Sequence, residues 1–218
     1  MSRPIVVAAH GTRSQLGQRT ITRAAELLAS ATGAAVTVGW IDVLEPTVDE
    51  VVAGLDSPVV VPWLVGGGFH LLVDVKRAAA ANPGATVLAP VGDSPGLVDA
   101  LVERLGDQAS DAATPVALLW AGSRMPVAQE RVAEIARRLG ERVGRPVTPV
   151  ALAASAVPAD EAVSALREGS DEPAAVSLLL APGYFHDLAR EVAAVTHPIG
   201  THPALIAAVA RDYAHLDD

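Results

Sequence analysis

The sequence predicts an α/β protein in which two related halves each form a small parallel sheet flanked by helices. Short apolar runs typical of buried strands alternate with stretches of helical periodicity along the whole chain. Half of the 218 residues are hydrophobic, which is enough to bury a sizeable core. Strand–helix alternation predicts parallel sheets covered by helices on both faces, and in such sheets ligands bind at the carboxyl ends of the strands.

The two halves are indicated by three blocks that recur in the same order. Residues 4–28 match residues 115–139, from a proline and an apolar strand through Gly-Thr/Ser-Arg into an Ala-, Glu- and Arg-rich helix. The segment "LVGGGFH" matches "LAPGYFH", and residues 89–105 match residues 197–213. Self-similarity of this kind indicates a duplication. We predict a first half at 1–112 and a second, diverged half at 113–218.

Each element of the first half has its own signal. The apolar runs at 6–9, 35–43, 58–65 and 86–90 predict four strands. Apolar residues at helical spacing predict helices at 18–30, 47–55, 71–81 and 95–105. Pro46 and Thr47 mark the start of the second of these helices, with Thr47 as its N-cap. The repeat extends the expectation of four strands to the second half.

Composition excludes several classes of function. The formal net charge of −9 argues against a nucleic-acid partner, which requires a basic surface. The chain contains no cysteine, so disulfides, iron–sulfur clusters and thiol catalysis are excluded. No run reaches the roughly 18 apolar residues of a membrane span, and the N-terminus lacks a signal-peptide pattern. We therefore expect a cytoplasmic protein that acts on neither membranes nor nucleic acids.

Chemistry-bearing residues gather after the strands of the first half. His10 follows the first strand, His70 follows the third, and the acidic residues Asp42 and Glu45 follow the second. The carboxyl ends of parallel strands meet at one edge of a sheet, so these residues should lie at one rim. Two histidines with nearby carboxylates can bind a divalent transition metal. The "VGGG" run could instead hold phosphate, but it matches neither the Walker nor the dinucleotide pattern.

The whole chain resembles the class II chelatases that act on sirohydrochlorin in siroheme and cobalamin synthesis. The resemblance rests on the segments "AHGTR", "WIDVLEP", "VPWLVGGGFHLLVD" and "PIGTHPAL". It implies two chelatase-like α/β domains facing each other across a cleft, with metal insertion into a tetrapyrrole as the reaction. His10 and His70 match the family's metal-binding histidines and are the expected catalytic residues, with Glu45 as a further metal ligand.

The resemblance also implies the substrates. The metal, Fe2+ or Co2+ with Ni2+ as a further candidate, is a substrate, and no permanently bound cofactor is expected. Sirohydrochlorin carries eight carboxylates, so basic and glycine-rich segments should contact it. We expect substrate contacts from five residues: Arg13, Gly67, Gly68, Arg124 and His186. Because the fused halves supply an internal pseudo-dimer, we expect a monomer.

The second half departs from the family pattern. Ala121 stands where His10 stands in the first half, and "VALAASAVP" has no carboxylate, although "GYFH" ends in His186. This loss leaves open a non-catalytic metal- or tetrapyrrole-binding protein as the alternative. A histidine phosphatase is less consistent with the sequence, because Ala9 replaces the arginine that precedes the nucleophilic histidine of that class.

Overall fold

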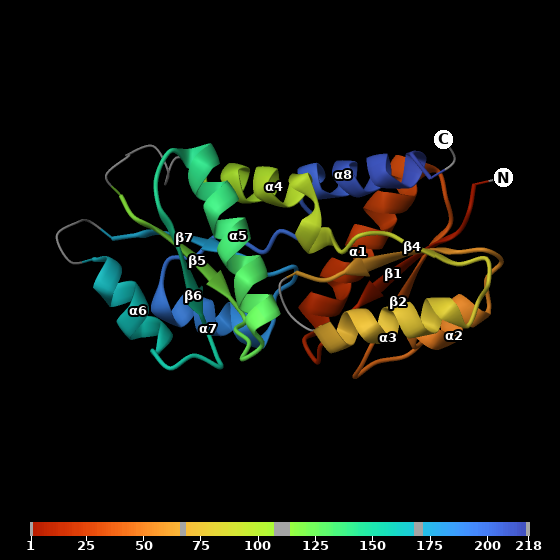
Figure 1. Ribbon diagram of the computed structural model, residues 1–218, viewed down its shortest axis with the longest axis horizontal. Coiled ribbons are helices and arrows are strands. Elements are labelled where there is room, and N and C mark those ends of the chain that lie inside the picture. The colour runs from red at the N-terminus through yellow and green to blue at the C-terminus, as the bar shows by residue number, and fades with distance from the viewer. Residues whose placement is uncertain (1, 66–68, 107–113, 168–171, 217–218) are drawn as a thin grey trace.

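The computed structural model describes residues 2–65, 69–106, 114–167 and 172–216, except for the side chains of residues 69–71. Two parallel sheets lie side by side, each with helices on both faces (Figure 1). The predicted fold class, two homologous α/β units, is therefore confirmed.

The first sheet has four strands in the order β2-β1-β3-β4, all parallel. Its strands are β1 (Ile5–Ala9), β2 (Val36–Trp40), β3 (Val59–Trp63) and β4 (Thr86–Val87). The helices of this half are α1 (Gln15–Thr32), α2 (Val48–Ala53), α3 (Phe69–Ala80), the short 3-10 turn η1 (Val91–Asp93) and α4 (Pro95–Leu105). The central strand is β1, so the residue that follows it lies at the middle of the carboxyl rim.

The second sheet repeats this plan with the order β6-β5-β7. Its strands are β5 (Val116–Trp120), β6 (Val147–Ala151) and β7 (Ala174–Ser177). The helices of this half are α5 (Pro126–Val143), α6 (Ala159–Leu166), α7 (Tyr184–Val192) and α8 (Pro203–Ala214). The expected fourth strand is not formed in the described part of this half: only an isolated parallel bridge, Ala175 to Val195, stands in its place. There the Thr196 N–H donates to the Ala175 carbonyl across the sheet, but the Val195 N–H donates to the Ala193 carbonyl of its own segment.

Most predicted elements occur, with shifted ends. The helix predicted at 95–105 has these same ends as α4, and Thr47 caps α2 in a capping box with Glu50. Helix α1 begins earlier than predicted, because the Ser14 side chain accepts a hydrogen bond from the Gly17 N–H and caps it. Strand β2 ends earlier, at Trp40, where the chain turns towards Pro46 and the Trp40 N–H donates to the Pro46 carbonyl.

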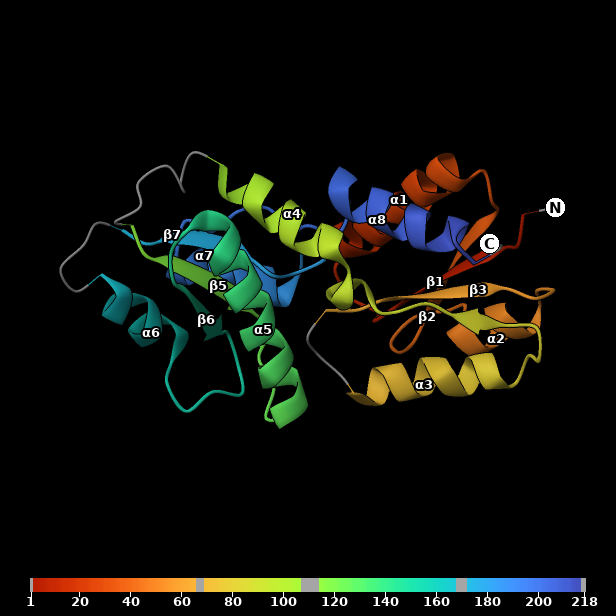
Figure 2. The ribbon, with the colours of Figure 1, turned by 45° about the horizontal axis from the view of Figure 1, so that its top comes forward.

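The two halves exchange their closing helices. Helix α4 follows the first sheet but packs against α5 and β7, while α8 follows the second sheet and packs against α1 (Figure 2). The two helices also pack on each other, so closely that a Cβ built on Gly96 would lie 2.4 Å from the Ala204 carbonyl oxygen. One apolar core therefore runs through both halves on this side. The division at 112/113 stays a prediction, because residues 107–113 lie outside the described part.

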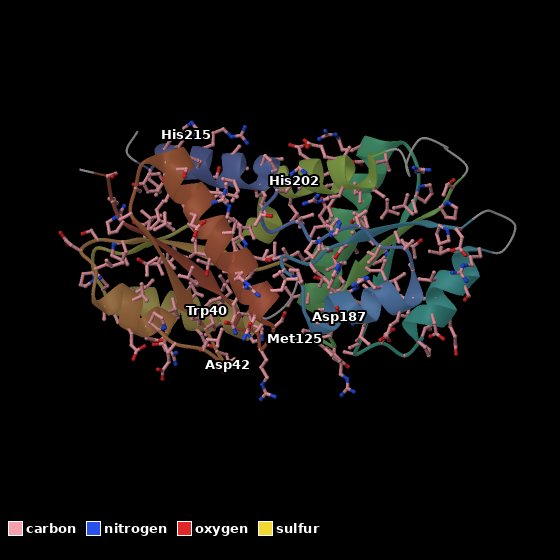
Figure 3. All side chains as sticks on the ribbon, turned by 180° about the vertical axis from the view of Figure 1, so that it is seen from behind. Trp40, Asp42, Met125, Asp187, His202 and His215 are labelled. Atoms are coloured by element: carbon pink, nitrogen blue, oxygen red, sulfur yellow. The ribbon has the colours of Figure 1, made fainter. Side chains whose placement is uncertain are left out.

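His202 stabilises this exchange. It is buried, its Nδ1 accepts a hydrogen bond from the Ala204 N–H at 3.3 Å, and it is thereby the N-cap of α8. Its Nε2 lies 3.4 Å from a carboxylate oxygen of Glu103 on α4. A structural role for this histidine, rather than a place at the carboxyl rim, follows from these contacts (Figure 3).

The opposite faces of the sheets have separate cores. In the first half, residues of α2 and α3 pack on Val6, Ala8 and Val60. In the second half, α6 and α7 pack on the corresponding strand positions. Because side chains alternate between the two faces of a strand, every second residue of β1 points towards α2 and α3, and this alternation extends to the residue that follows the strand.

Candidate functional site

His10 stands directly after the central strand of the first sheet. Val6 and Ala8 face the core beneath α2 and α3, so the alternation directs His10 to that same face, where it is exposed. Strand β3 pairs with β1 and leads to α3, whose second residue is His70. The backbone thus brings both predicted metal ligands to one corner of the rim. The His70 side chain and residues Gly67 and Gly68 lie outside the described part.

The acidic loop after β2 lies against this corner. A Cβ built on Gly11 would stand only 2.0 Å from the Asp42 backbone oxygen, so only glycine fits beside His10. Asp42 is exposed, and its Oδ1 accepts a hydrogen bond from the Val43 N–H at 2.7 Å. Glu45 is exposed on the same loop. The contact at Gly11 is thus what brings the acidic loop next to the histidine.

The described side chains do not by themselves complete a metal site. No group of three or more histidine, aspartate or glutamate side chains is close enough to hold an ion within the ranges that the structure describes. The predicted set of His10, His70 and Glu45 includes one side chain outside those ranges, so it stays a prediction.

Two arginines occupy corresponding positions on the two rims. Arg13 follows Gly11 and Arg124 follows Gly122, and both side chains are exposed. Neither forms an ion pair with any described residue, whereas Arg77 pairs with Asp49 and Asp74. Exposed guanidinium groups that pair with no described residue are suited to bind carboxylates of a ligand.

The two rims meet near these residues. A Cβ built on Gly17, in the first turn of α1, would lie 2.5 Å from the Pro182 carbonyl oxygen of the second half. A Cβ on Gly183 would lie 3.4 Å from the Thr12 hydroxyl. Asp42 and Asp187 lie on the same side of the molecule, from opposite halves (Figure 3). The chelatase resemblance predicts a cleft between the halves, and the described residues do not test it, so the cleft stays a prediction.

A family model named CbiX matches the chain twice, over residues 4–108 and 115–216. The chain belongs to the CbiX family. The two matches coincide with the two halves inferred from the sequence, and the resemblance to the sirohydrochlorin chelatases is confirmed at the level of the family.

Solved structures share the fold of this CbiX-family chain. SirB from Bacillus subtilis with Fe3+ superposes with a TM-score of 0.73 at 24% identity, covering 100% of this chain and 98% of that one. CbiX, described as the terminal enzyme for biosynthesis of siroheme in denitrifying bacteria, gives 0.70 at 20% identity, with coverages of 98% and 99%. DR2241 from Deinococcus radiodurans gives 0.73 at 24% identity, but this chain spans only 55% of its length. No curated protein matches the sequence.

The sequence matches His70 to His186 through "GGFH" and "GYFH". Counted from the paired strand residues Val59 and Ala174, helices α3 and α7 both begin ten residues later, at Phe69 and Tyr184. Both histidines lie in the first turn of their helices, and their equivalence stays a prediction.

His186 itself is buried, with a relative exposure of 7%. Its Nδ1 has no hydrogen-bond partner among the described residues. Burial lowers its pKa, and the nearby Arg190 and His197 lower it further, against an opposing effect of Asp187. The substrate contact expected of His186 stays a prediction.

A cavity in the second half was not foreseen from the sequence. It has a volume of about 460 Å³ and is lined by Trp120, Ser123, Ala151 and the loop 154–157, among others. The last rung of the first sheet pairs Ala9 with Trp40, and that of the second sheet pairs Trp120 with Ala151, so the indole has changed strands between the halves. Trp120 thereby forms part of the wall of this cavity. The exchange of tryptophan and alanine between the two strand ends is visible in the repeat.

The exposed apolar side chains of the described residues gather at the carboxyl rims. Each large one lies in the loop, or in the first two helical turns, after a strand: Leu16, Val43, Val73, Val127, Val157, Tyr184 and Phe185. The opposite ends of the two sheets carry no such residue within the described ranges. Apolar surface concentrated at one rim is typical of a ligand-binding site. No helix in the described part of the chain is long and apolar enough to cross a membrane.

Proposed function

We propose that this CbiX-family protein inserts a divalent metal ion into sirohydrochlorin, in the biosynthesis of siroheme or cobalamin. The structural observation that carries the proposal is the makeup of the joined rims. An exposed histidine, His10, follows the central strand of the first sheet. Arg13 and Arg124, which form no ion pair with a described residue, and exposed apolar side chains of both halves lie on the same carboxyl rims. A tetrapyrrole combines a flat apolar ring with peripheral carboxylates, and this rim offers a complement to both.

The chain's residues divide the chemistry between them. Arg13 and Arg124 bind peripheral carboxylates and orient the ring. His10 and His70 hold the metal through neutral imidazole nitrogens, which bind first-row divalent ions but release them more readily than thiolates do. Glu45 is the further ligand on the metal side. As the metal enters the ring, two pyrrole N–H protons leave, and imidazole groups are suited to accept them near neutral pH.

The proposal includes the finer assignments. Fe2+ and Co2+ are the metals we favour, with Ni2+ as a further candidate, because a histidine and carboxylate set accepts all three. One apolar core runs through both halves, so each half already covers the other. This supports a monomer. We also propose that the protein acts in the cytoplasm and binds no nucleic acid.

The test is an anaerobic insertion assay with Fe2+ or Co2+ and sirohydrochlorin, followed by absorption spectroscopy. Wild-type protein should turn over many times, and His10→Ala should lose more than the roughly 10- to 100-fold typical of removing an outer ligand partner. His215→Ala is the matched control, because His215 is exposed and its ring contacts only the Arg211 carbonyl of its own helix. Both variants should keep the wild-type unfolding midpoint. Stoichiometric binding without turnover would instead identify a non-catalytic binding protein.

A further inference from the structure

Two aromatic side chains open helix α7 at the junction of the halves. Tyr184 is 71% exposed and Phe185 is 36% exposed. Their rings contact each other edge to face, with centroids 5.3 Å apart and planes at 66°. Together they form a preformed aromatic surface, because an edge-to-face pair of this kind is itself a favourable arrangement.

The position of the pair ties it to the site of the other half. Gly183 directly precedes Tyr184, and a Cβ built there would lie within 3.6 Å of Thr12 and Ser14. Thr12 and Ser14 belong to the loop that connects His10 to α1. The aromatic pair therefore begins where the second half touches the histidine loop of the first half.

The second half lacks two of the donors of the first rim. Ala121 stands for His10, and the acidic loop is replaced by residues 153–156, which carry no carboxylate. Ala153 keeps the backbone contact of its counterpart, because a Cβ on Gly122 would lie 1.8 Å from its carbonyl oxygen. The loop geometry is thus retained while the donor side chains are gone. What the second rim offers in their place is aromatic surface.

We infer that Tyr184 and Phe185 are positioning residues that contact one face of the tetrapyrrole macrocycle, while the first half presents the metal. This inference rests on the proposed function and names the part of the site that holds the ring. Aromatic side chains stack on flat conjugated rings without needing a specific hydrogen bond. The negative net charge of the chain would repel a polycarboxylate, so uncharged ring contacts add affinity that charge alone does not supply.

The experiment compares Tyr184→Ala and Phe185→Ala with Tyr184→Phe, which keeps the ring. Glu191→Ala, an exposed position two turns further along α7, is the control. Binding of metal-free sirohydrochlorin is measured by absorption titration, and Co2+ binding is measured separately in its absence. We expect Tyr184→Ala to weaken sirohydrochlorin binding and raise KM about tenfold, with kcat and Co2+ affinity nearly unchanged. Tyr184→Phe should restore binding to within about twofold of wild type.

Two results would overturn the inference, and they differ from failure of the proposed function. If both alanine variants bind sirohydrochlorin as wild type does, the ring is held elsewhere. If Tyr184→Ala loses Co2+ affinity, the residue belongs to the metal side. Wild-type protein that neither binds sirohydrochlorin nor inserts metal contradicts the proposed function and the inference with it. Because both aromatic side chains are exposed, the variants should unfold at the wild-type midpoint.

Discussion

Replacing Gly96 by alanine should separate the exchanged helices α4 and α8. A Cβ at this position would lie 2.4 Å from the Ala204 carbonyl oxygen and 2.6 Å from the Ala208 Cβ, where ordinary contacts begin near 3.4 Å. Neither neighbour is a flexible side-chain end, so the two helices must move apart by about 1 Å. Overpacking of this kind costs about 1–3 kcal/mol, and the better helix propensity of alanine returns at most about 1 kcal/mol.

The expected net loss is about 1–2 kcal/mol, which for a chain of this length lowers Tm by about 2–8 °C. Gly54→Ala is the matched control, because Gly54 has φ −85° and its nearest neighbour would be 3.5 Å away. The assay is thermal and urea unfolding of both variants beside wild type. A Gly96→Ala protein as stable as Gly54→Ala would show that the close crossing of α4 and α8 does not contribute to stability.

Two further predictions concern protonation and charge. Burial lowers the pKa of His202, opposed by Glu103 and assisted by Arg104, so folding favours the neutral ring. The neutral His202 ring therefore stabilises the fold fully at a pH above its unfolded-state pKa of about 6.5. This stabilisation is lost as the pH falls from that value towards the lower pKa of the folded state. Urea unfolding between pH 5 and 8 should show this loss, and His202→Asn, which can still cap α8, should reduce the slope. Replacing Arg13 or Arg124 by alanine should raise KM for sirohydrochlorin about two- to fivefold, with kcat retained and the difference shrinking in high salt; unchanged KM values at low salt would contradict the assignment.

The local features of the site could be predicted because they depend on short stretches of sequence. A buried run that ends in "AHG" places His10 at a strand end, and the matching run before Arg124 reveals the second rim. The Thr47 cap can likewise be predicted from the neighbouring residues, because Pro46 precedes it and Glu50 follows three residues later. Each of these features follows either from the alternation of side chains along a strand or from the free N–H groups at the start of a helix.

The features that were missed depend on packing between distant segments. An apolar stripe on α4 shows that the helix is buried, but not which sheet it covers. The burial of His186 was likewise missed, because it depends on how α7 packs against the second sheet, which no local pattern reveals. The cavity beside Ala151 was missed because its size depends on how the loop 154–157 runs above it.

The exchange of closing helices leads to a last prediction about the first half alone. In the whole chain, α1 is covered by α8, and the buried residues of α8 that pack there include Leu205, Ile206 and Val209. A fragment of residues 1–112 lacks α8, but it carries α4, which is the repeat counterpart of α8. Two copies could cover each other if each α4 packs on the α1 of its partner, which restores the exchange with two-fold symmetry. We therefore expect the fragment, if it is expressed alone, to be a dimer by analytical ultracentrifugation, and Gly96→Ala to weaken that dimer. A folded monomeric fragment would show that the first sheet does not need a closing helix from outside its own half.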